Sequence, residues 1–149
     1  MFEKILVGYD GSKGGKAALA GAVALAGKFG SQVTALWVRE PLPRHSDLPG
    51  ESEAEAEAAD DYFKERQQEV AAVAVQHGLS IACETRRGHP AKNILQAAKD
   101  GGFGLIVVGH SDHSELWGRL LGDTADRITD HAYCSVLVVK TEVSSPKQP

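Results

Sequence analysis

Residues 107–112 read VVGHSD and residues 122–124 read GDT, and this stretch says most about the fold. A short apolar run ends at Gly109, a polar segment follows, and a second glycine, Gly122, precedes a helical pattern. In an α/β protein, a strand that leads through a glycine turn into a helix usually marks the place where a phosphate group is held. However, Asp112 and Asp123 put carboxylates in this segment, where a phosphate would favour bare backbone or a hydroxyl. The stretch therefore predicts an α/β fold and leaves phosphate binding open.

The rest of the chain alternates between short apolar runs and longer helical patterns. The run at residues 5–9 is typical of a strand buried on both faces, Ser12 can cap the helix after it, and Gly30 and Gly78 can end helices. Five strands separated by helices imply a parallel sheet with helices on both faces. The strand nearest an edge should be 79–85, because polar positions interrupt it. The predicted strands are residues 5–9, 33–38, 79–85, 105–109 and 135–140. The predicted helices are one that follows Ser12, runs through residues 17–26 and stops near Gly30, one at residues 51–76, a short one opened by residues 88–90, and one at residues 123–131.

Composition favours one cytoplasmic domain. The chain has 149 residues, 42% of them hydrophobic, and a formal net charge of −4, which argues against nonspecific binding to nucleic acid or to an anionic membrane. No apolar run approaches the ~20 residues that span a bilayer, and the start of the chain lacks the pattern of a signal peptide. The two cysteines, Cys83 and Cys134, fit buried thiols in a reducing compartment. We expect one domain over residues 1–141 and a flexible polar tail over residues 142–149.

The carboxyl ends of the strands should form the ligand crevice, at the point where the strand order reverses. This expectation brings together residues 8–12, 37–40 and 109–123. Asp10 can accept hydrogen bonds from ribose hydroxyls or help to bind a divalent metal, or it can form a tight turn with the two residues after it; both interpretations stay open. Gly109 and Gly122 would let backbone approach a pyrophosphate, or they serve turns alone.

Sequence motifs for catalysis and metal binding are weak or missing. Neither G-x-x-x-x-G-K-[ST] nor G-x-G-x-x-G follows a strand, and no Walker lysine or water-activating arrangement can be identified. The spacing of His110, His113 and Glu115 with Asp112 is weak support for a metal site, so we expect none. We therefore expect no enzyme, or at most a very weak ATPase.

Five segments together resemble one known family, the universal stress proteins, over about residues 2–140. The segments are residues 4–12, 88–90 with Ile94, 105–111, 120–122 and 135–139. The resemblance implies an open five-stranded parallel sheet of order 3-2-1-4-5, similar to a Rossmann fold and to the adenine nucleotide alpha hydrolases. It also implies a homodimer through the last strand. An apolar edge formed by Val136, Leu137, Val138 and Val139 would otherwise stay exposed, and proteins usually cover or pair such edges.

The ATP-binding branch of that family carries G-x2-G-x9-G-[S/T]. Gly109 and Gly122 stand at the family's spacing, but Asp112 replaces the middle glycine and Asp123 takes the hydroxyl position, with Thr124 one residue late.

The resemblance also implies roles outside the glycine motif. It places Asp10, which follows Tyr9, against the ribose or a metal, the backbone of Val38 against adenine, and Val108 beside the nucleotide.

Two functions follow from this altered motif. In the first, the chain is a regulatory stress protein that binds ATP or AMP, with Mg²⁺ able to bridge carboxylate and phosphate. In the second, it is an interaction protein of the same fold, unable to bind ATP because Asp112 and Asp123 block the phosphates. A carboxylate about 4 Å from one phosphate charge repels it by roughly 1 kcal/mol in water and about 4 kcal/mol at an intermediate dielectric. Asp123 can also act as the N-cap of the helix that follows.

Overall fold

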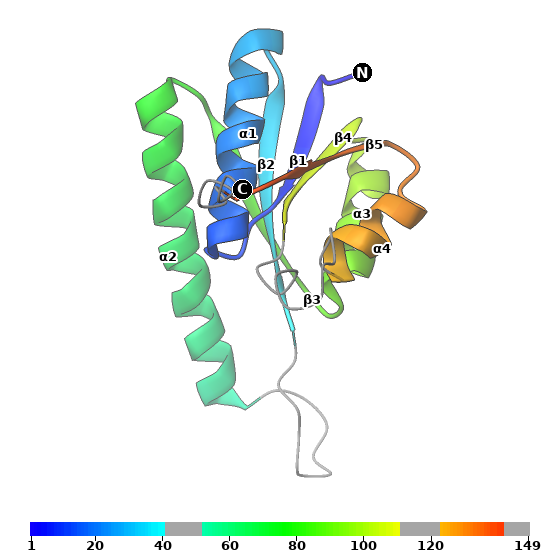
Figure 1. Ribbon diagram of the computed structural model, residues 1–149. Helices are drawn as coiled ribbons and strands as arrows, with labels where there is room; N and C mark the ends of the chain where they lie inside the picture. The colour runs from blue at the N-terminus through cyan, green and yellow to red at the C-terminus, as the bar shows by residue number, and fades with distance from the viewer. Residues whose placement is uncertain (41–51, 111–122, 142–149) are drawn as a thin grey trace, which may run out of the picture.

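A computed structural model describes residues 1–40, 52–110 and 123–141. Figure 1 shows a central sheet with helices on both sides. The elements are β1 (Lys4–Gly8), α1 (Lys13–Phe29), β2 (Gln32–Arg39), α2 (Glu53–His77), β3 (Ile81–Arg87), α3 (Pro90–Gly101), β4 (Leu105–Gly109), α4 (Asp123–His131) and β5 (Ser135–Val139). The expected tail, residues 142–149, lies outside the described residues.

The sheet has five strands in the order β3-β2-β1-β4-β5, and every neighbouring pair is parallel. The predicted fold class and strand order are therefore confirmed. Ile5 of β1 pairs with Val33 on one side and with Leu105 on the other. The strand order reverses between β1 and β4, so the ligand crevice of such a sheet falls beyond their carboxyl ends.

Two apolar cores, one on each face, hold the sheet in place. On the face covered by α1 and α2, the core includes Ile5, Val7 and Leu19. On the face covered by α3 and α4, it includes Ile106 and Ile128. Each of these side chains is at most 2% exposed, and burying one contributes about 1.5–3 kcal/mol. The carboxyl ends of β1 and β4 are thus carried by well-packed strands.

Capping residues set the helix boundaries largely where the sequence predicts them. The Ser12 hydroxyl accepts a hydrogen bond from the Gly15 N–H at 3.1 Å, and Gly30 ends α1 in the left-handed conformation with φ of 65°. Ser52 and Glu55 form a reciprocal capping box at the start of α2. Pro90 stands in the first turn of α3, where its missing N–H costs little.

One strand begins later than predicted. The N–H of Leu79 donates to the carbonyl of Ala74 at 2.8 Å, so Leu79 belongs to the C-terminal cap of α2. As a result β3 spans Ile81–Arg87 and not residues 79–85. It is an edge strand, as its polar positions predict.

The helices of the described residues include none with the length and apolar character needed to cross a bilayer.

Candidate functional site

The carboxyl ends of β1, β2 and β4 lie next to one another, and they bring together five of the residues expected in the site. Backbone bonds extend the pairing past the strand ends: the N–H of Tyr9 donates to Leu36 and that of His110 to Val139, both at 2.9 Å. Asp112 and Gly122 lie outside the described residues. The five residues at or directly after these strand ends are Tyr9, Asp10, Val38, Val108 and Gly109.

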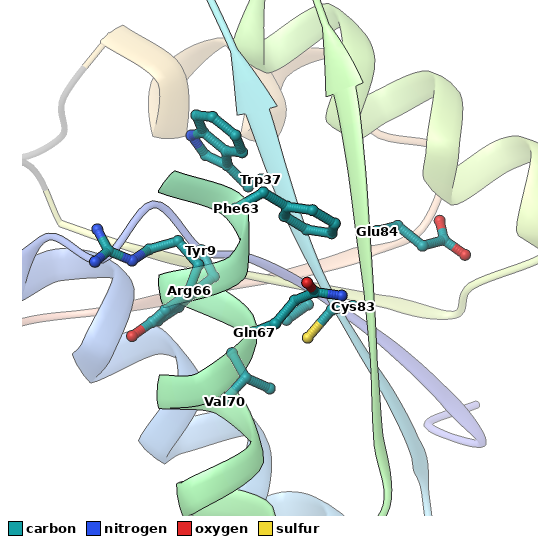
Figure 2. Close-up of a pocket in the computed structure, with 9 residues that line it drawn as sticks. Tyr9, Trp37, Phe63, Arg66, Gln67, Val70, Cys83 and Glu84 are labelled. Atoms are coloured by element: carbon teal, nitrogen blue, oxygen red, sulfur yellow. The ribbon is translucent and has the colours of Figure 1, made fainter. Parts of the chain in front are cut away.

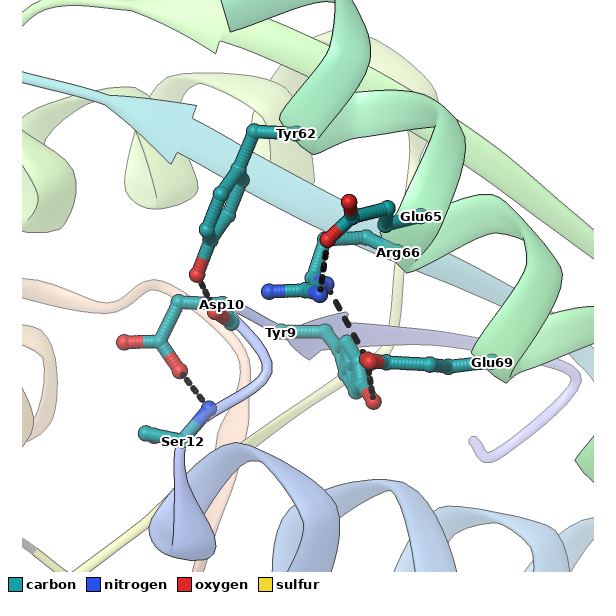
Figure 3. Close-up of polar contacts among 7 residues, drawn as sticks. All are labelled: Tyr9, Asp10, Ser12, Tyr62, Glu65, Arg66 and Glu69. Carbon is teal, nitrogen blue, oxygen red and sulfur yellow. Dashed lines mark hydrogen bonds and ion pairs between the residues drawn. The ribbon is translucent and has the colours of Figure 1, made fainter.

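Asp10 organises the turn between β1 and α1. Its Oδ1 accepts a hydrogen bond from the Ser12 N–H at 2.9 Å, and Gly11 adopts a positive φ of 81°, which favours glycine. Asp10 is exposed, and in Figure 3 its second carboxylate oxygen points away from the turn. The turn-forming role is therefore present, and it leaves one oxygen directed outward.

Gly109 meets the first turn of α1 through its backbone. A Cβ on Gly109 would lie 2.1 Å from the carbonyl oxygen of Gly14, and a Cβ on Gly14 would lie 3.1 Å from the carbonyl oxygen of His110. Any side chain on Gly109 would force α1 away from β4. Gly109 thus has a packing role in this chain, and this role joins the N-terminus of α1 to the end of β4.

The side chains of Val38 and Val108 pack into the core on the α3 and α4 face. Val108 is 5% exposed. Val38 is half-buried, and the backbone role that the family resemblance implies for it stays a prediction.

Tyr9 points to the opposite face, toward α2. Its side chain lies in the core beneath that helix, and its hydroxyl donates to Glu69 Oε1 at 2.8 Å. Burial raises the pKa of the Tyr9 phenol, and the hydrogen bond to Glu69 raises it further. The Tyr9 side chain therefore serves the packing of α2.

The helix α4 begins at Asp123, where the sequence predicts its start. The carboxylate of Asp123 lies in the first turn, at the positive end of the helix dipole, which favours an acid there. Asp123 is exposed, while Thr124 is half-buried. Because β4 and β5 are parallel, the start of α4 lies toward the carboxyl edge of the sheet.

Three side chains of α2 also reach the segment around Asp10: Tyr62, Arg66 and Glu69. The sequence patterns did not predict these contacts. The Tyr62 hydroxyl donates to the backbone carbonyl of Asp10, and Figure 3 shows this contact beside Arg66 and Glu69. Tyr62 and Phe63 are aromatic residues in an otherwise polar helix segment, which is the one signal that could have indicated a buried contact there.

A small pocket lies under the same part of α2. Figure 2 shows the aromatic rings of Trp37 and Phe63 on it, with the Cys83 thiol nearby. Burial raises the pKa of the Cys83 thiol, which keeps it protonated at neutral pH. The lining residues come from β1, β2, β3 and α2: Tyr9, Ala35, Trp37, Phe63, Arg66, Gln67, Val70, Cys83 and Glu84.

Within residues 1–40, 52–110 and 123–141, no three His, Cys, Asp or Glu side chains are grouped so that they could hold a metal ion. The sequence pattern of His110 with His113 and Glu115 cannot be followed further, because the last two lie outside the described residues.

The strand order, its reversal between β1 and β4 and the helices on both faces define an open α/β protein of the Rossmann-like class. The family model described as the universal stress protein family matches residues 1–140. The chain therefore belongs to the universal stress protein family.

Individual relatives agree with this assignment. A universal stress protein of Methanocaldococcus jannaschii is 32% identical over 142 residues, covering 94% of this chain and 83% of the relative. One from Bacillus subtilis is 32% identical over 148 residues, covering 94% of this chain and 100% of the relative. The solved universal stress protein UspA of Lactobacillus plantarum is 30% identical, with a TM-score of 0.73 over 93% of this chain and 97% of the other.

Two more distant structures share the fold and contain adenine nucleotides. One is a universal stress protein in complex with cAMP, 22% identical with a TM-score of 0.69 over 94% of this chain and 98% of the other. The other is an Arabidopsis thaliana family protein with AMP bound, 13% identical with a TM-score of 0.64 over 94% of this chain and 92% of the other.

Proposed function

We propose that this protein is a cytoplasmic regulatory stress protein that binds an adenine nucleotide at the carboxyl ends of β1, β2 and β4. The observation that carries the proposal is the backbone contact between Gly14 and Gly109. It brings a helix N-terminus to the end of β4, beside the Asp10 turn. Helix N-termini attract anions because their N–H groups and dipole are positive. The adenine nucleotides in two fold relatives support the same choice of ligand.

The proposed ligand is AMP in preference to ATP. Asp123 is exposed at the start of α4, and Asp112 takes the place of a glycine in the motif. A carboxylate about 4 Å from a phosphate charge costs roughly 1–4 kcal/mol, depending on the dielectric. ATP is repelled more strongly than AMP, because it places three phosphates near these carboxylates and AMP places one. Mg²⁺ would reduce the difference by bridging acid and phosphate.

The second candidate function is an interaction protein of the same fold that binds no nucleotide. The acids at the phosphate loop favour it, because a carboxylate held at a helix N-terminus occupies the place of the phosphate. Both candidates describe binding and not turnover. We also propose that the protein forms a homodimer through β5.

Calorimetry with AMP, and with ATP with and without Mg²⁺, separates these functions. We expect wild-type protein to bind AMP more tightly than ATP. Asp112→Gly with Asp123→Ser should strengthen ATP binding at least tenfold, since about 1.4 kcal/mol of relieved repulsion is a factor of ten, and should change AMP binding by less than about threefold.

Asp130→Ser is the matched control, because it removes an exposed acid from the far end of the same helix. Equal and tight ATP binding by wild type and double variant would show that the acids do not block the site. No binding of AMP or ATP by either protein would favour the interaction protein.

A further inference from the structure

Among the residues that the structure describes, few side chains hold the N-terminal half of α2 to the rest of the protein. The buried residues of α2 are Val70 and Ala74, both in its second half. The helix has 25 residues and is thus about 37 Å long, and in Figure 1 its first turns extend beyond the sheet. Residues 53–61 are exposed or half-buried. Docking of this half therefore depends on the first side chains that reach the sheet.

Those side chains contact the turn that carries Asp10. The Tyr62 hydroxyl donates to the backbone carbonyl of Asp10, and the Tyr62 ring packs on Trp37 with 4.8 Å between centroids. The Arg66 guanidinium lies 4.2 Å from the centroid of the Tyr62 ring. It also lies so close to Gly11 that a Cβ there would be 2.7 Å from Arg66 Nη1. Tyr62 thus bonds the turn at Asp10, and the Arg66 side chain lies against it at Gly11.

Arg66 is itself fixed by acids of its own helix. Its Nη2 bonds Glu65 at 3.1 Å, and its Nε lies 3.0 Å from Glu69 Oε1, at ion-pair distance but without hydrogen-bond alignment. Glu69 Oε1 also accepts the Tyr9 hydroxyl. The Arg66 side chain is 15% exposed. The cluster therefore joins α2 to Tyr9 and Asp10 through hydrogen bonds (Figure 3), and its Arg66 lies against Gly11.

We propose that Tyr62 and Arg66 are positioning residues of the nucleotide site: they hold the β1–α1 turn so that the outward oxygen of Asp10 faces the ligand. This inference rests on the proposed function. A nucleotide that orders the turn then also favours docking of the N-terminal half of α2. The coupling is reciprocal, because a change in helix docking must alter nucleotide affinity by the same factor.

Tyr62→Phe tests the proposal, since it removes the hydroxyl and keeps the ring on Trp37. We expect AMP affinity to fall by roughly three- to tenfold, the effect of one lost hydrogen bond. In wild type, AMP should slow amide hydrogen exchange in residues 53–61. In the variant this distant slowing should be lost, which a purely structural role of Tyr62 would not produce.

Tyr133→Phe is the control. Its hydroxyl donates to the carbonyls of Ala98 and Phe103 at 2.6 and 3.1 Å, so the same chemical change is made away from the crevice. It should leave AMP affinity and exchange in residues 53–61 unchanged. Unchanged affinity and exchange in Tyr62→Phe would overturn the proposal.

A wild-type protein that binds no AMP would contradict the proposed function separately. In that case, exchange of the amides of residues 10–16 without ligand decides the inference. Faster exchange in Tyr62→Phe supports the positioning role, and unchanged exchange overturns it.

Discussion

Among single residues, Gly14 of α1 and Gly109 of β4 pack backbone against backbone. The contact leaves no room for a side chain, because a Cβ on Gly109 would overlap a carbonyl oxygen at 2.1 Å. That oxygen belongs to backbone, which cannot swing aside as a flexible side chain can. Substitution at Gly109 should therefore affect the fold as well as the crevice.

We expect Gly109→Ala to destabilise the protein by about 1–3 kcal/mol, the usual range for overpacking a tight site. Gly27→Ala is a matched control, because a Cβ at Gly27 in α1 would meet nothing within 4 Å. That change should stabilise the protein by about 0.5–1 kcal/mol through helix propensity. Urea unfolding measures both variants. A Gly109→Ala protein as stable as wild type would contradict the packing role.

The Tyr9 phenol makes the free energy of unfolding depend on pH in the alkaline range. Its folded pKa is raised above the usual 10.0, so the folded protein keeps a proton that the unfolded chain releases. This contribution to stability is fully present below pH 10 and is lost as the pH rises above it. Tyr9→Phe should cost about 1 kcal/mol at pH 7 by removing the bond to Glu69. Urea unfolding across pH 7–11 should show the two proteins converging above pH 10; a constant difference would speak against this effect.

At the scale of elements, the two edge strands of the sheet differ in charge. The edge strand β3 carries Glu84, Arg86 and Arg87, and charges protect an edge from pairing with another chain. The opposite edge, β5, has the sequence SVLVV without a charge, and Leu137 on it is 36% exposed. Of the two edge strands, β5 is therefore the one without charged residues, which favours it as the surface of the proposed homodimer.

Leu137→Glu should convert the homodimer into monomers in sedimentation velocity, because it puts a charge on the pairing edge. Ala82→Glu makes a comparable change at an exposed position of β3 and should leave the dimer intact. A dimer that persists with Glu at position 137 would show that pairing uses another surface.

The bounds of most helices and strands could be predicted from the sequence. The segment Asp123–His131 was predicted to the residue, and so was Leu105–Gly109. The start of β3 was predicted two residues early, because Leu79 looks like a strand residue by its side chain but bonds back to Ala74. Local apolar patterns do not show that the residue after a C-cap glycine bonds back to the helix and so cannot begin the next strand.

At the scale of the whole molecule, the two cores on opposite faces of the sheet depend on β5. Val136 and Val138 pack on one core and Val139 on the other. The folding unit that we propose therefore extends through β5 to residue 141. The family model ends close by, at residue 140.

A chain shortened after Thr141 should melt within about 2 °C of the full protein, because it retains every packed valine. A chain shortened after Cys134 loses the three packed valines of β5. Their burial contributes a large part of a typical stability of about 5–15 kcal/mol, so this chain should not fold cooperatively. Thermal unfolding by circular dichroism compares them. A large loss of stability in the first variant would show that residues 142–149 belong to the folded unit.

The order of helices and strands, the parallel sheet and the family could be predicted from the sequence alone. Each follows from local patterns and caps, or from motifs that lie within short segments. The folded chain was needed to show that Gly109 meets Gly14, that the Tyr9 side chain turns toward α2, and that Tyr62 and Arg66 contact the Asp10 turn. These contacts join residues far apart in the chain, such as the 52 positions between Asp10 and Tyr62. Side chains meet across such distances only after the sheet and helices have packed, so no local pattern could show them.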